Sequence, residues 1–202
     1  MWYFRGEIIR TPKTIQVDGL KFNKEVFMNS TKLAEVGIKP YSEVKPDLRY
    51  FSLGTVNIND SGTEVTGTYQ AIGKDTDILK SNMLKLIKRH LTNRLEATDW
   101  YYLRKLRTGT DVPVDIQEYS DTLYSEYDTK KSEISAMNKI SQIEEYENRA
   151  HTEVRKVKSY KNNKTIYGPE TESTTIHINM INHWTSNPDD GVDPAFVSLT
   201  AD

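Results

Sequence analysis

The sequence predicts an α+β protein, because strand-forming and helix-forming patterns occupy separate parts of the chain. Residues 1–73 contain short alternating runs with turn residues between them, whereas apolar residues recur at helical spacing from residue 75 to residue 146. Alternating runs then return before an acidic end. We therefore expect an N-terminal antiparallel β-rich domain over 1–73, a helical hairpin over 74–147, and a short C-terminal tail over 148–202 that contains a β-hairpin.

The β-rich region contains one strong hairpin signal. Residues 14–17 and 20–22 alternate in polarity, and Asp18 and Gly19 between them suit a type I′ turn with positive φ at both positions. Ser30 can cap a short helix over 31–36, and Gly37 suits the left-handed residue after it. Residues 63–69 carry few large apolar side chains, so we expect that strand at an edge or with one face in water.

Two helical regions follow. In the first, capped by Asp75 or Thr76, the apolar residues at helical spacing are Leu79, Met83, Leu86, Ile87, Leu91 and Leu95. The second begins after Pro113 and continues towards residue 146, with a break expected near Asp128 and Thr129. These two regions are expected to pack as a helical hairpin.

The pattern of the last part of the chain predicts a hairpin followed by an irregular tail. Residues 161–164 form the expected turn before a strand at 165–169, and residues 174–180 alternate as one further strand. Beyond them Pro and Asp residues predominate. We expect this acidic tail to need a partner in order to become ordered.

Composition excludes several classes of protein. The 202-residue chain has a net charge of −2, which disfavours a duplex nucleic-acid binder, and it has no cysteine. The lack of cysteine excludes disulfides, thiolate zinc sites, iron–sulfur clusters and cysteine nucleophiles. No apolar run has the roughly 20 residues that a membrane helix needs, and the first residues contain no basic leader. We expect a soluble protein that is not exported by the Sec pathway, with no membrane and no nucleic-acid partner.

No residue pattern indicates catalysis or a cofactor. His177 and His183 are spaced to share a strand face, and residues 189–193 faintly resemble a calcium loop, but packing and a solvated turn are the better explanations. The adjacent carboxylates, Glu144 with Glu145 and Asp189 with Asp190, point apart. Neither a phosphate-binding glycine loop nor a Gly-x-Ser-x-Gly motif is present. We therefore expect neither an enzyme nor a bound metal or cofactor.

Charge and tyrosine content suggest contact surfaces. Residues 81–110 and 148–165 are net basic, whereas 111–147 and 166–202 are net acidic, as in segments that dock on oppositely charged neighbours. Differently solvated faces explain the same pattern. The basic residues Lys85, Lys88, Arg89 and Arg94 could contact phosphates, but pairing within or between subunits is the better explanation. The 12 tyrosines suit half-buried interface positions or the edges of a helix pair.

The most informative motif lies in the helical region. It comprises residues 95–105, with Leu95, Thr98, Asp99, Trp100 and Arg104, then Thr108, Gly109 and Pro113, and finally Tyr119 and Leu123. It resembles the pattern of bacteriophage tail-associated proteins, including tail-fibre assembly proteins and virion proteins of marine phages. The resemblance covers most of residues 1–170. Ser120 stands where many relatives have arginine, and Arg107 where an acidic residue is common, so the family's local ion pairs are not carried over.

Physical reasoning gives this motif the role of a structural clasp. The turn at Gly109 and Pro113 reverses the chain and brings Tyr119 and Leu123 back against the first helix. Trp100 is expected to bury roughly 200 Å² between the helices, so that its truncation to alanine would cost about 3–5 kcal/mol. The clasp residues are Leu95, Asp99, Trp100, Arg104, Gly109, Pro113, Tyr119 and Leu123.

The resemblance implies a non-catalytic virion structural protein of the phage tail or tail-fibre apparatus. Its expected partners are other tail or virion proteins and copies of itself in a homo-oligomer. Its expected location is the virion tail, and the host cytoplasm during assembly. The alternative is a tail-fibre assembly chaperone that is absent from the mature particle.

Overall fold

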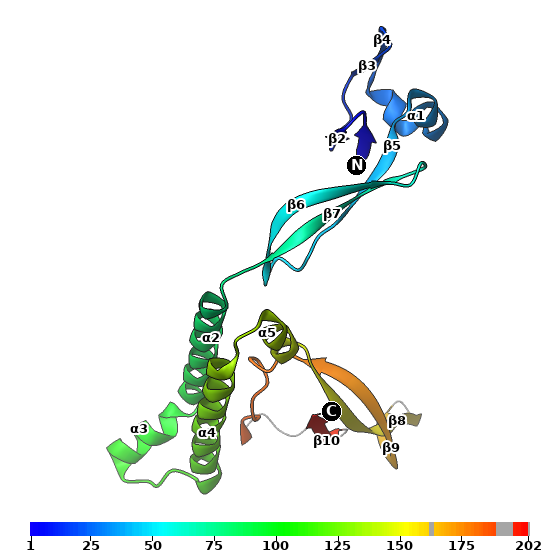
Figure 1. The fold of residues 1–202 in the computed structure, drawn as a ribbon. Helices are drawn as coiled ribbons and strands as arrows, with labels where there is room; N and C mark the ends of the chain where they lie inside the picture. The colour runs from blue at the N-terminus through cyan, green and yellow to red at the C-terminus, as the bar shows by residue number, and fades with distance from the viewer. Residues whose placement is uncertain (162–163, 189–195, 202) are drawn as a thin grey trace. The chain divides into compact units, whose positions relative to one another are not determined.

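The computed structural model describes residues 1–161, 164–188 and 196–201, and it has the predicted α+β fold (Figure 1). The chain divides into two compact units, Met1–Lys74 and Asp75–Asp202. This division lies one residue from the boundary expected after residue 73. The boundary expected after residue 147 falls inside the second unit, which contains both the long helices and the strands that follow them.

The first unit is built mainly from strands. Its elements are β1 (Trp2–Phe4), β2 (Glu7–Ile9), β3 (Ile15–Val17), β4 (Leu20–Phe22), a 3-10 helix (Lys24–Met28), α1 (Ser30–Val36), β5 (Lys39–Val44), β6 (Phe51–Asp60) and β7 (Val65–Gly73). Five strands form one sheet in the order β2-β1-β5-β7-β6, and β3 pairs with β4 in a separate hairpin. The turn of that hairpin has φ of 50° at Asp18 and 84° at Gly19, as predicted.

The prediction of a purely antiparallel sheet is wrong for one pair of strands. β5 and β7 run parallel, with Tyr41 beside Val65, while β6 pairs antiparallel with β7 on the other side. β7 is therefore an interior strand rather than an edge strand, although most of it beyond Gly67 is exposed. The reason is that alternation of polarity predicts a strand but does not specify which strand pairs with it or in which direction.

The core of the first unit lies beneath α1 and the small hairpin. Its buried members are Ile9, Ile15, Val17, Val26, Phe27 and Ile38. Trp2 meets Phe27 edge to face, with 4.9 Å between ring centroids. On the larger sheet the buried Tyr41 ring lies across Gly67, where any Cβ would collide with the tyrosine hydroxyl, so this position requires glycine.

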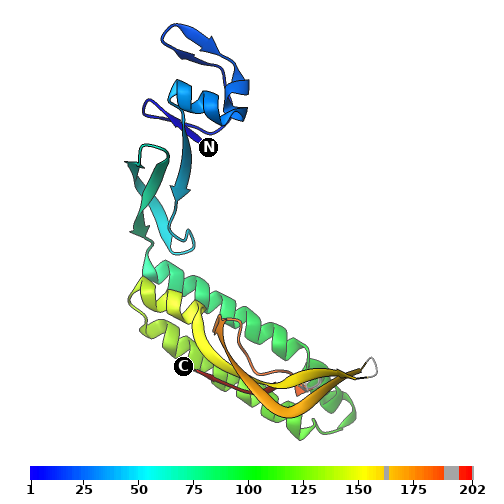
Figure 2. The same cartoon turned by 90° about the vertical axis from the view of Figure 1, so that its right-hand side faces the viewer.

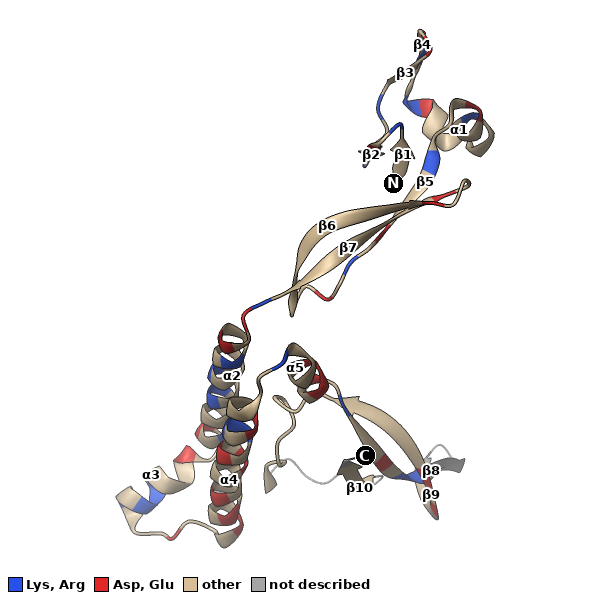
Figure 3. Ribbon diagram, in the orientation of Figure 1, with Lys and Arg blue, Asp and Glu red and all other residues tan. Residues whose placement is uncertain are grey.

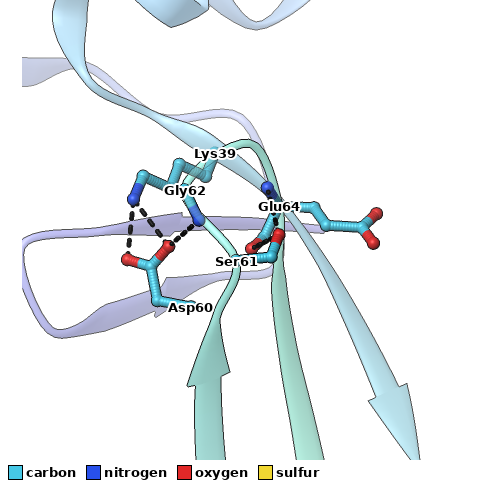
Figure 4. A network of polar contacts seen from close by, with 5 residues as sticks. All are labelled: Lys39, Asp60, Ser61, Gly62 and Glu64. Atoms are coloured by element: carbon cyan, nitrogen blue, oxygen red, sulfur yellow. Dashed lines mark hydrogen bonds and ion pairs between the residues drawn. The ribbon is translucent and has the colours of Figure 1, made fainter.

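Polar side chains fix the ends of two elements in this unit. The N-cap of α1 is Asn29, whose side chain accepts a hydrogen bond from the Lys32 amide at 3.1 Å, and not the predicted Ser30. Asparagine and serine are both good N-cap residues, and the two are adjacent here, so the sequence pattern could not decide which of them begins the helix. At the β6–β7 turn, Lys39 Nζ donates to the Asp60 carboxylate at 2.7 Å, and the Gly62 amide donates to it at 2.9 Å (Figure 4).

The second unit contains the long helices and a second sheet. Its elements are α2 (Thr76–Glu96), α3 (Asp99–Thr108), α4 (Val114–Ala136), α5 (Ile140–Glu147), β8 (Arg149–Lys161), β9 (Lys164–Ile178) and β10 (Phe196–Ala201). α2 begins at the predicted cap, because the Asp75 carboxylate accepts a bond from the Asp77 amide at 2.7 Å. α2 and α4 lie side by side, and β8 and β9 form a long curved hairpin (Figures 1 and 2).

Three expectations for the second unit are corrected. α4 is unbroken at Asp128 and Thr129, since the Thr129 hydroxyl is satisfied by the Ser125 carbonyl at 2.9 Å without leaving the helix, and the break falls after Ala136. β9 is one strand rather than two, since an irregularity in its pairing with β8 absorbs Gly168 and Pro169. Part of the expected irregular tail, β10, pairs antiparallel with β8.

Candidate functional site

The helix pair that the clasp was expected to hold is present as α2 and α4, but its buried residues differ from the prediction. Tyr119 and Leu123 on α4 are 4% and 0% exposed, and Met83, Ile87 and Leu91 are the buried residues of the neighbouring α2. Leu95 at the end of α2 is half-buried. These side chains close the α2–α4 pair with apolar contacts.

The expected burial of Trp100 is wrong, because its side chain is 49% exposed. It lies in the first turn of α3, where its ring packs on Tyr101 with 3.7 Å between centroids and the Arg104 guanidinium lies 5.0 Å away. The buried residue at this corner is Thr98, whose hydroxyl donates to the Leu95 carbonyl at 3.0 Å. The fully buried residue between α2 and α3 is therefore a small hydroxyl residue and not the large aromatic ring.

The turn residues of the clasp lie where they were predicted. Asp99 is in the first turn of α3, where a negative charge is favourable. Gly109 ends α3 with φ of 72°, and its amide donates to the Lys105 carbonyl at 2.9 Å. Pro113 directly precedes α4. Together they reverse the chain between the two helices.

The most unusual surface of this unit is the apolar side of α3, which the analysis of the sequence missed. Trp100, Leu103 and Leu106 are 49%, 52% and 84% exposed, and their three-residue spacing places them on one side of the helix. None of the residues of α3 is buried, and the helix projects from the end of the α2–α4 pair (Figure 1). We call these three residues the α3 surface. The spacing itself was the signal that could have revealed it.

A polar bond attaches α3 to the rest of the unit. The Tyr102 hydroxyl lies 3.0 Å from Ser120 Oγ on α4, and Ser120 in turn donates to the Ile116 carbonyl at 3.0 Å. Here the small buried hydroxyl serves as the acceptor that orients α3.

Charged side chains flank the apolar contacts of the helix pair. Lys85, Lys88 and Arg89 are exposed on α2, and Asp115, Glu118 and Asp121 are exposed on α4 (Figure 3). Arg94, which the sequence grouped with the basic cluster, instead donates to the Thr185 carbonyl at 3.1 Å. The two helices therefore offer surfaces of opposite charge to solvent.

A second cluster joins the segment after β9 to α2 and α4. Lys130 is 5% exposed, and its Nζ donates to the Met180 carbonyl at 2.6 Å and lies 5.1 Å from the Trp184 ring. Glu126 accepts a bond from the Thr185 amide at 3.2 Å. A pocket of about 220 Å³ opens beside Lys130, Glu126 and His183. We call this cluster the Lys130 joint.

The histidines do not form the arrangement that the sequence suggested. His183 stacks with His151, with 6.0 Å between ring centroids, whereas His177 Nδ1 lies 3.2 Å from the Asn148 carbonyl. Within the described residues there is no group of three or more His, Asp or Glu side chains that could hold a metal ion. The possible calcium loop at 189–193 lies outside the described residues.

Burial near the joint gives a prediction about pH. Burial lowers the pKa of His183, helped by the positive charges of Lys130 and Arg94, and burial also lowers the pKa of His90. The unfolded chain therefore binds protons more readily than the folded chain as pH falls below the ordinary value of 6.5. The free energy of unfolding should be highest above that pH and fall as the pH decreases towards the lowered pKa values.

Urea unfolding followed by circular dichroism at about pH 7.5 and about pH 5.0 tests this, because the window avoids most of the carboxylate titration. We expect lower stability at the acidic pH and a smaller difference for His183→Gln. Equal stability at both pH values, or the same difference in the variant, would contradict the assignment.

The chain matches no protein-family model, no curated protein and no solved structure. Among the helices in the described part of the chain, none is both long enough and apolar enough to cross a membrane.

Proposed function

We propose that this chain is a non-catalytic phage virion protein of the tail or tail-fibre apparatus, which acts through subunit assembly. The observation that carries the proposal is the α3 surface, a helix with no buried residue that holds three large apolar side chains in solvent. The resemblance of residues 95–123 to tail-associated proteins supports the same role. Its partners are other virion proteins and copies of itself, in the tail and, during assembly, in the host cytoplasm.

The physical basis is the free energy that the α3 surface gains when a neighbour covers it. Full burial of one large apolar side chain is worth roughly 1.5–3 kcal/mol. Because Trp100 and Leu103 are already about half-buried, covering the three residues supplies about 2–5 kcal/mol towards association. Tryptophan is enriched among the residues that dominate binding at the centre of protein interfaces, and a group of exposed large apolar side chains marks an interaction surface. The charged surfaces of α2 and α4 would then favour the correct orientation of the neighbour.

Mass spectrometry of gradient-purified particles of the encoding phage tests the proposal. A structural component should be present in stoichiometric amounts. Absence from finished particles would overturn the structural assignment and favour a tail-fibre assembly chaperone that uses the same surface transiently.

A charge placed on the α3 surface should prevent incorporation. Leu106→Glu changes an 84% exposed residue, so folding should be unaffected while the apolar contact is lost. Ile78→Glu on α2, at a residue that is 61% exposed, is the matched control. We expect particles complemented with Leu106→Glu to contain at least about tenfold less of the protein than those with Ile78→Glu. Equal incorporation of the two variants would argue against the α3 surface.

A further inference from the structure

The free edge of the sheet in the first unit has the features of a second binding surface. β6 is the last strand in the order β2-β1-β5-β7-β6, and within the described residues no strand pairs with its outer side. It is ten residues long, from Phe51 to Asp60. An edge strand of this length presents a row of backbone donors and acceptors that can continue the sheet.

β6 lacks two of the usual protections against such pairing, charged side chains and proline, although it contains a bulge between Leu53 and Val56. Residues 51–59 contain no charged residue and no proline. The other long edge strand, β9, carries Pro169, Glu170 and Glu172, which discourage the approach of another strand. The contrast is visible along β6, which is uncharged except at its end (Figure 3). The neutral edge therefore allows pairing that the charged edge opposes.

The apolar side chains of β6 lie on one face of the sheet. Leu53, Val56 and Ile58 are 40%, 36% and 39% exposed. An extra residue in β6 between Leu53 and Val56 shifts the register against β7, so an odd sequence separation still leaves all three on the same face. Tyr41 and Val65 occupy the buried part of this face. The three β6 residues therefore continue the apolar face out to the free edge.

We propose that β6 pairs antiparallel with β6 of a second copy of this chain, about a twofold axis. The inference rests on the proposed function for its assumption that the chain assembles with copies of itself. The pairing joins two five-stranded sheets into one and places the two apolar rows side by side on the same face. Each copy shields the other's Leu53, Val56 and Ile58, and the open backbone groups of both edges become paired.

Charge is the reason for choosing a second copy as the occupant. The charged residue of β6 is Asp60, at its end, and Lys39 neutralises it through the 2.7 Å contact (Figure 4). Because β6 holds one extra residue between Leu53 and Val56, a pairing centred on Val56 brings Asp60 of one copy beside Phe51 and Ser52 of the other, so no two like charges face each other. An uncharged strand can therefore pair with a second copy of itself without charge repulsion. A charged partner strand would have no opposite charge to pair with along residues 51–59.

Sedimentation velocity of the full chain tests the proposal. Wild type should contain dimers at micromolar concentration. Val56→Lys places a charge in the middle of the edge and should raise the dimer dissociation constant about tenfold or more. Ile72→Lys is the matched control, because Ile72 is 51% exposed on the interior strand β7. It should leave the dissociation constant within about twofold of wild type.

Cysteine cross-linking gives an independent measurement, because the chain contains no cysteine of its own. In a twofold antiparallel pair, only residues near the axis face their own copy closely enough for a disulfide, at about 4.4–6.8 Å between Cα atoms. Single cysteines at Ser52, Val56, Asn57 and Asn59 should therefore give a maximum of disulfide-linked dimer at Val56 or Asn57. A uniform yield along the strand would overturn the pairing.

The outcomes separate this inference from the proposed function. Monomeric wild type, or unchanged self-association of Val56→Lys, overturns β6 pairing even when the protein is found in virions. A dimer that depends on β6 supports the pairing even when virions lack the protein, in which case the structural role fails. A strand from a different virion protein at this edge would appear as monomeric wild type in the purified state.

Discussion

Leu123→Ala is expected to lower the free energy of unfolding of the helical unit by about 2–5 kcal/mol, the range for deleting a large buried aliphatic side chain. Leu123 is 0% exposed on α4, whose neighbour α2 buries Ile87 to the same degree. The change leaves a cavity between two long helices that cannot collapse without moving the clasp. Stability of this unit therefore depends on the α4 side of the clasp.

Trp100→Ala is the matched comparison, because Trp100 belongs to the same predicted clasp but is 49% exposed. Its loss should cost less than about 1 kcal/mol, as for most exposed substitutions. Urea unfolding followed by circular dichroism at the helical band reports on the second unit, which contains α2, α3, α4 and α5. Equal destabilisation by the two variants, or a larger effect of Trp100→Ala, would contradict the exposed position of Trp100 and indicate that its side chain is buried.

The elements that the sequence predicted well are those fixed by local chemistry. Asp18 and Gly19 adopt the positive φ values of the expected turn, Asp75 caps α2, and Gly109 ends α3 in the left-handed conformation. Each of these depends on residues within four positions in the chain. The helical spacing of Met83, Ile87 and Leu91 likewise identified the buried side of α2.

The features that the sequence did not predict depend on distant partners. The parallel pairing of β5 with β7 and the addition of β10 to β8 join segments whose local patterns do not specify a neighbour. The predicted burial of Trp100 was wrong for a related reason. Whether a side chain of α3 is buried depends on the direction in which α3 leaves the α2–α4 pair, and not on the size of the side chain. Thr98, 0% exposed, occupies the corner instead.

The Lys130 joint could not be predicted from the sequence either. Lys130 and Met180 are 50 positions apart, and Arg94 and Thr185 are 91 apart. The sequence pattern predicts an exposed, solvated lysine in this acidic helix. In the structure, burial lowers the pKa of Lys130, and its ammonium group donates to a backbone carbonyl. The joint explains why the expected separate C-terminal domain belongs to the helical unit.

Trp184→Ala should lower the free energy of unfolding by about 3–5 kcal/mol, at least as much as Leu123→Ala, because it removes the aromatic centre of this joint. Trp184 is 6% exposed, its Nε1 donates to the Ile181 carbonyl at 2.8 Å, and its ring faces the Lys130 ammonium group. Without the ring, the ammonium group loses its cation–π contact and the Ile181 carbonyl loses its donor.

Limited proteolysis and urea unfolding together test this role of Trp184. Trp184→Phe retains most of the apolar surface but removes the N–H group, so it should cost only about 1 kcal/mol. In the alanine variant we expect cleavage between residues 179 and 188 to become at least about tenfold faster, because opening of the segment exposes its backbone. Unchanged cleavage with an unchanged urea midpoint would mean that Lys130 and Glu126 hold the segment without the indole, and that the joint is polar rather than aromatic at its centre.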